Sequence, residues 1–239
     1  MKAWQRKIRT AQRILACLAS LFCCAASAAQ TVRPLVAELG NPCKGRVEYY
    51  NDSLTPLNVV LEARSFTVSE TGQISYRQLD PGIHLKLSVS SFRLQPQQSF
   101  YVFYEASTEA SPAWFVLYAA FSGFPFRTEQ GMSVRLELPH TVYLLPKGSL
   151  RKDEIVIKRA DFVAADKKLV LEVENTGDKF GRVQQTFVSF GKKTQEAPGF
   201  PVFPHSKRIM EWPFDEAPSA VQLLFSNFKV EGPVPARGP

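Results

Sequence analysis

Short alternating segments separated by turn residues run through nearly the whole sequence, and this pattern constrains the fold more than any other feature. The clearest segment spans residues 131–146, where apolar residues occupy every second position at Met132, Val134, Leu136 and Leu138. Successive side chains of a β-strand point to opposite faces, so this spacing predicts a strand with one apolar and one polar face. Further strands are expected near residues 32–39, 46–50, 57–67, 74–79, 85–92, 99–105, 114–122, 155–163, 169–174, 182–190, 200–203, 206–212 and 221–230.

The residues between these segments are typical of turns. They include the sequences NDS, TPL, SETG, DPG, QPQQ and GFPF. Gly allows positive φ, Pro fixes φ, and Asn or Asp bonds its own backbone. Short strands at regular spacing with such turns indicate a β-sandwich, and almost no segment predicts a helix. The predicted fold class is therefore all-β.

The two halves of the chain resemble each other weakly. VEYYNDS (47–53) matches LEVENTG (171–177), and FRLQPQQSFYV (92–102) matches FPVFPHSKRIM (200–210). Such internal similarity favours two sandwiches over one. The predicted domains cover 30–147 and 148–232, and the Pro- and Gly-rich segment 233–239 is expected to be a disordered tail.

The first 29 residues differ from the rest. Residues 1–13 carry five basic residues and no acidic ones, residues 14–24 are apolar, and residues 25–29 are small. This order predicts a secretory signal peptide, and its apolar run is shorter than the ~20 residues that span a bilayer. In a Gram-negative bacterium the exported chain is expected in the periplasm and not embedded in the membrane.

Removal of the signal peptide changes the charge and the cysteine count. The formal charge falls from 29 − 22 = +7 to 24 − 22 = +2, and the basic residues that remain are scattered, so nucleic-acid binding is not expected. Of four cysteines only Cys43 remains, and no internal disulfide is predicted. The sandwiches must then be held together by their apolar cores.

No pattern predicts an enzyme, a metal site or a cofactor. The histidines His84, His140 and His205 are isolated, without a second ligand at short spacing. Neither a nucleophile elbow nor a phosphate-binding loop is present. Cys43 is interpreted as a structural thiol, with an intermolecular disulfide as the alternative.

Several motifs in a fixed order resemble the periplasmic pilus-assembly chaperones of the chaperone–usher pathway. The first strand holds Arg33, and a later strand ends at Asn51. VSSFRLQPQQSFYVFY is similar to the family's stretch apolar-x-Arg-Leu-x-Pro-Gly, and the aromatic strand WFVLYAAF follows it. A long alternating strand then ends at Pro146, and VFPHSKRIMEW is similar to the family's Pro-x-Ser segment.

This resemblance implies two immunoglobulin-like sandwiches at an angle to one another. It also implies that the chain lends a strand to pilus or surface-fibre subunits that lack one, and that it delivers them to an outer-membrane usher. The residues inserted into the subunit would be Met132, Val134, Leu136 and Leu138. A bulge-like break is expected at residues 138–140, where the alternation changes phase.

The family also binds the carboxylate at the subunit's C-terminus with two basic residues. Arg33 matches the first of these positions, and Thr141 occupies the second, where the family usually has Lys. From the pattern alone, the strand at 132–138 simply packs its own core, and only the resemblance makes it a lending strand. Two alternatives therefore stay open: a secreted two-domain binding or adhesion module without chaperone activity, and a homodimer that caps its own edge.

Overall fold

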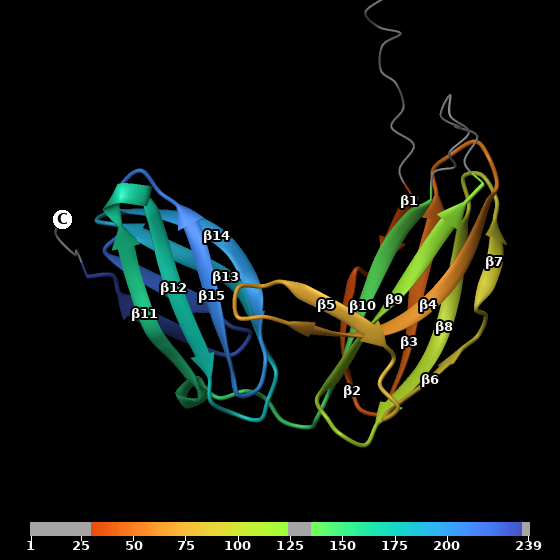
Figure 1. Cartoon of the computed structure of the whole chain (residues 1–239), viewed down its shortest axis with the longest axis horizontal. Coiled ribbons are helices and arrows are strands. Elements are labelled where there is room, and N and C mark those ends of the chain that lie inside the picture. The colour runs from red at the N-terminus through yellow and green to blue at the C-terminus, as the bar shows by residue number, and fades with distance from the viewer. Residues whose placement is uncertain (1–29, 124–134, 236–239) are drawn as a thin grey trace, which may run out of the picture.

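The strands form two β-sandwich domains set at an angle, as Figure 1 shows for this computed structural model. The structure describes residues 30–123 and 135–235. The predicted signal peptide, Met132 and Val134 lie outside these residues. The prediction of an all-β chain with two sandwiches is confirmed.

Domain 1 consists of two sheets that enclose two apolar clusters. Its strands are β1 (Gln30–Arg33), β2 (Val36–Gly40), β3 (Cys43–Asn51), β4 (Leu57–Val68), β5 (Ile74–Gln78), β6 (Ile83–Leu87), β7 (Ser91–Leu94), β8 (Ser99–Thr108), β9 (Ala113–Ser122) and β10 (Leu136–Leu145). One sheet has the order β1-β3-β8-β6, and the other has β2-β10-β9-β4-β5 with β7 also on β4. The pairing of β2 with β10 is parallel.

Domain 2 repeats this plan with fewer strands. Its elements are η1 (Lys152–Glu154), β11 (Ile155–Val163), η2 (Ala164–Asp166), β12 (Lys168–Asn175), β13 (Gly181–Phe190), β14 (Lys193–Val202), β15 (Ser206–Pro213), β16 (Ala220–Leu224) and β17 (Lys229–Pro233). The sheets have the orders β11-β12-β15 and β14-β13-β16-β17. The tail was expected from residue 233, but Pro233 belongs to β17 and Val234 is buried in the core of domain 2; residues 236–239 lie outside the described part.

The strand β9 is buried on both faces, which explains its unbroken apolar sequence. Its inward residues, such as Phe115 and Phe121, pack in the core of domain 1. On the outer face, Trp114 lies 4.7 Å from the ring of Phe203 in domain 2. A strand covered on both sides has no polar face to show in its sequence.

The predicted break at residues 138–140 is wrong. Strand β10 pairs with β9 without interruption from Leu136 opposite Phe121 to Leu144 opposite Ala113. The apparent change of phase has another cause. Beyond His140 the outward residues become apolar because domain 2 covers them, and Tyr143 stacks on Phe180 at 4.5 Å.

The weak internal similarity corresponds to a shared turn in the two domains. Asn51 ends β3 and Asn175 ends β12, and both side chains are fully buried. Each amide nitrogen donates to the backbone carbonyl four residues later, Thr55 or Lys179, at 2.8 Å. Each amide oxygen accepts the backbone N–H two residues later. The buried Asn thus satisfies the backbone groups of the chain reversal in both halves.

Candidate functional site: the free edge of β10

The N-terminal segment moves from one sheet to the other between β1 and β2, and this leaves part of β10 without a neighbour on one side. Strand β1 pairs with β3, the chain crosses at Pro34, and β2 then pairs with β10 over Thr141–Leu145. The preceding residues of β10, 136–140, are paired with β9 on one side only. Among the residues that the structure describes, no strand occupies the other side. Such an edge is a template for an added strand.

The hydrogen bonds of the crossover show which backbone groups point outward. The N–H of Thr141 donates to the carbonyl of Leu35 at 2.8 Å, away from β9. Backbone groups of a strand alternate in direction, so those of Glu137 and Pro139 also point to the free side. Pro139 has no N–H, which suits an edge position. The described free edge therefore offers one donor, at Glu137, and the carbonyls of Glu137 and Pro139.

The two described residues of the predicted lending row face the interior of domain 1. Leu136 and Leu138 are half-buried and pack against the cluster that contains Val32 and Phe121. They lie at the rim of the sandwich, so part of each side chain remains accessible. Their insertion into a subunit stays a prediction.

A buried histidine, absent from the sequence-based site, ties the crossover to the core. The ring Nδ1 of His140 lies 2.7 Å from the carbonyl oxygen of Pro34, and Nε2 lies 3.1 Å from the hydroxyl of Tyr104. A carbonyl can only accept, so Nδ1 carries the proton and the Tyr104 hydroxyl donates to Nε2. Gly45 makes room for this tyrosine, because a Cβ there would lie 2.3 Å from the ring. The only sequence signal was a His at an inward position of an alternating strand.

We expect the stability of domain 1 to fall below about pH 6.5. Burial lowers the pKa of His140 from the usual 6.5, so the unfolded chain binds the proton more readily than the folded one. The unfolding free energy is then constant above the unfolded pKa and decreases as the pH falls below it, by at most about 1.4 kcal/mol per pH unit. Urea unfolding between pH 8 and pH 5 measures this slope.

The control variant for this slope is His140→Gln, which keeps a donor and an acceptor but does not titrate. It should flatten the pH dependence of domain 1, whereas His205→Gln should not, because His205 lies in domain 2, between β14 and β15. An equal slope in the parent protein and in His140→Gln would contradict the role of His140.

The two predicted anchoring residues lie at the same crossover. Arg33 is the exposed last residue of β1. The backbone N–H of Thr141 donates to the carbonyl of Leu35, which lies two residues after Arg33. Within the described ranges, no carboxylate forms an ion pair with Arg33. Its guanidinium is therefore free to bind an anion, while Thr141 contributes no charge.

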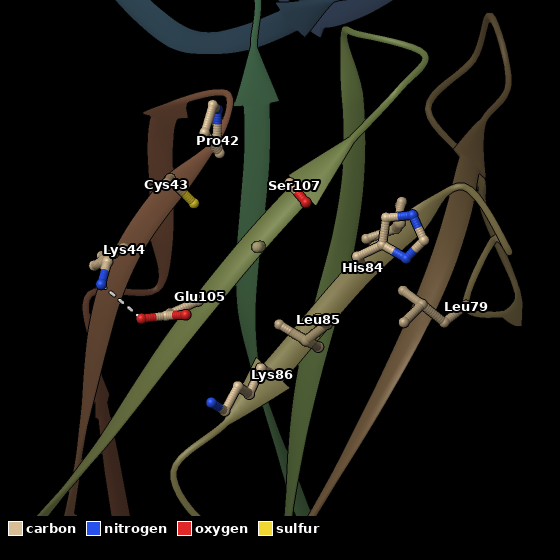
Figure 2. A pocket seen from close by; sticks show the side chains of 11 residues that line it. Pro42, Cys43, Lys44, Leu79, His84, Leu85, Lys86, Glu105 and Ser107 are labelled. Atoms are coloured by element: carbon tan, nitrogen blue, oxygen red, sulfur yellow. Dashed lines mark ion pairs between the residues drawn. The ribbon is translucent and has the colours of Figure 1, made fainter.

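A hollow of about 680 Å³ lies over β3, β8 and β6 (Figure 2). Figure 2 shows Cys43 on β3, His84 on β6 and the ion pair of Lys44 with Glu105, at 2.7 Å, beside them. Burial raises the pKa of the Cys43 thiol, which opposes formation of a reactive thiolate. In the described chain no group of three or more His, Cys, Asp and Glu side chains could hold a metal ion. The hollow carries no catalytic arrangement.

No protein-family model and no curated protein matches the chain. Several solved structures do match the chain. The Salmonella enterica SafA pilin in complex with the SafB chaperone matches with a TM-score of 0.55 at 10% identity, over 86% of this chain and 96% of the other. The CsuC–CsuE chaperone–tip adhesion subunit complex of Acinetobacter baumannii matches with 0.52 at 14%, over 85% and 98%.

A third match is the Pseudomonas aeruginosa CupB2 chaperone, with a TM-score of 0.50 at 12% identity, over 87% of this chain and 100% of the other. The chain thus has the two-domain fold of the pilus chaperones along nearly their whole length. At this identity the likeness establishes the fold. Over residues 30–123 and 135–235, no helix is long and apolar enough to cross a membrane.

Proposed function

We propose that the protein is a periplasmic chaperone that caps pilus or surface-fibre subunits by lending them the free edge of β10. The observation that carries the proposal is the half-paired state of this strand: β2 closes its edge from Thr141 onward, and residues 136–140 remain open. A subunit that lacks a strand exposes backbone groups and apolar side chains, and an added strand covers both.

The solved relatives support this function. Two of them are complexes of a chaperone with a pilin or with a tip adhesion subunit. In the proposal, Arg33 contributes to binding of the subunit's C-terminal carboxylate, and an outer-membrane usher receives the complex. The predicted signal peptide at residues 1–29 accounts for export.

The open edge makes a residue-level prediction for the complex. The probe is a small secreted β-rich subunit, to be sought among the genes that adjoin this one, co-expressed and purified with this chain. Binding should slow hydrogen exchange of the Glu137 amide by roughly 100-fold or more, because it gains a partner. The amides of Thr141 and Tyr143 should be unaffected, because β2 already pairs them. Unchanged exchange at Glu137 in a purified complex would contradict lending by β10.

The role of Arg33 is tested by substitution. Arg33→Ala should weaken capture of the same subunit about 10-fold or more, because a hydrogen bond to a charged group contributes about 1.5–3 kcal/mol. Thr141→Ala should have a smaller effect, since its backbone makes the contact with Leu35. The control is Arg46→Ala, an exposed arginine on β3. Equal affinities of all three variants and the parent would remove the carboxylate role.

A second candidate is a two-domain binding or adhesion module. The contacts of Leu136 and Leu138 with the domain's own core favour it, because an ordinary edge strand makes such contacts. In that case the subunit encoded nearby would not bind, or would bind without protecting Glu137.

A further inference from the structure

The hairpin of β4 and β5 extends out of domain 1 and reaches domain 2 (Figure 1). Its strands pair as far as Val68 and Ile74, and residues 69–73 form the tip. The turn is closed by two bonds between Ser69 and its neighbours: the Ser69 N–H donates to the Gln73 carbonyl, and the Gly72 N–H donates to the Ser69 carbonyl, both at 2.9 Å. Gly72 has φ +93°, a conformation that Gly adopts readily.

The tip docks on β15 through the backbone. The N–H of Ile209 donates to the carbonyl of Glu70 at 2.8 Å. Strand β15 is at the edge of the β11-β12-β15 sheet, so this bond uses a donor that faces away from β12. The tip of domain 1 therefore closes part of an edge of domain 2.

The side chain of Arg208 on β15 also binds the tip. Its side chain is buried, and its Nη1 donates to the carbonyl of Ser69 at 2.7 Å and to that of Glu70 at 3.4 Å. A buried guanidinium is costly unless its donors are satisfied. The Nε of Arg208 is buried without a hydrogen-bond partner, and its oxygen acceptors are the carbonyls of the other domain's turn, so the hydrogen bonds that offset its burial depend on docking.

A second contact between the domains lies beside the connector at residues 146–151. The ring of Tyr143 stacks on Phe180, and Trp114 lies against Phe203. Arg182 of β13 pairs with Glu38 of β2 and lies over the ring of Tyr143 at 5.2 Å. This junction is apolar and ionic, whereas the hairpin contact consists of hydrogen bonds to the backbone carbonyls of the tip.

We propose that the β4–β5 hairpin is an interdomain strap that holds the two domains at one angle. A connector and a single contact would leave a hinge axis, and relative motion is the usual state of linked domains. The connector, the aromatic junction and the docked tip are separate attachments, and together they remove rotation about that axis. For its functional meaning this inference rests on the proposed chaperone role: a fixed angle would preorganise the space between the domains before a subunit binds.

The test measures interdomain orientation without any subunit. Amide residual dipolar couplings are recorded on the parent protein and on a shortened variant in which Asn-Gly replaces residues 69–73. The paired Val68 and Ile74 accept such a two-residue turn. In the parent, one alignment tensor should fit both domains. In the shortened variant, the tensors should differ, with the magnitude for one domain reduced by roughly half.

Two single substitutions complete the test. Arg208→Ala should give the same separation of tensors, whereas Lys207→Ala should not, because Lys207 bonds Glu172 within domain 2 at 3.1 Å. If Arg208→Ala unfolds domain 2, the shortened variant decides, since it leaves the sequence of domain 2 unchanged. A single common tensor in the shortened variant would overturn the strap. Failure of the chaperone proposal would leave this result unaffected.

Discussion

The variant Leu136→Arg is expected to lose capture of its subunit while both domains stay folded. In the proposed complex this side chain enters an apolar groove, and an unpaired charge there costs about 3 kcal/mol or more, which is a loss of roughly 100-fold in affinity. In the free protein Leu136 is only half-buried, at the first position of β10. The long Arg side chain can reach water from there, so the loss of stability should be only about 1–2 kcal/mol. Co-purification and thermal unfolding measure the two effects.

The control for this variant is Val156→Arg, which places the same side chain at an exposed apolar position of β11. It should capture the subunit like the parent. If Leu136→Arg unfolds domain 1, Leu136 belongs to the core and the lending row loses its support. Normal capture by a folded Leu136→Arg would contradict the proposal directly.

The variant Gly199→Ala is expected to destabilise domain 2 by about 3 kcal/mol or more. Gly199 lies in β14, where the backbone passes close to β13. A Cβ at this position would lie 2.0 Å from the carbonyl oxygen of Val183 and 2.5 Å from that of Gln184. Both are backbone atoms, so relief requires the strands to separate. Calorimetry should show a lower transition temperature for domain 2.

The matched control is Gly82→Ala, because a Cβ at Gly82 meets no atom within 4 Å. It should leave both transitions nearly unchanged. A Gly199→Ala protein with a parental transition for domain 2 would show that β14 can shift without loss of stability.

Period-two alternation was sufficient to predict the strands and the two sandwiches. The internal similarity of the two halves also marked two equivalent turns, since Gln97 and His205 have φ values of 55° and 49° at matching places in segments 92–102 and 200–210. Three expected strands, 32–39, 85–92 and 221–230, are each divided between two elements. The alternation continues across such a division, so the sequence does not reveal that the chain moves to another sheet or turns back.

The parts that could not be predicted depend on contacts between distant residues. The tip sequence SETG is typical of any solvent-exposed turn, and nothing in it indicates that Arg208 binds its carbonyls. His140 looked isolated because its partners, Pro34 and Tyr104, are far away in the sequence. The true continuity of β10 was hidden because domain 2 covers the outer face, which makes residues on both faces apolar.

The buried asparagines bear on the order in which the molecule is assembled. Asn51 takes its partners from residues 53–95, and Asn175 takes its own from residues 177–202. Each half can therefore complete its chain reversal as soon as that half of the chain is present, N-terminal half first. Docking of the tip must wait for residues 208–209. During that interval the tip at residues 69–73 lacks its partners on β15, and the incomplete second sandwich is most exposed to pairing with a neighbouring copy.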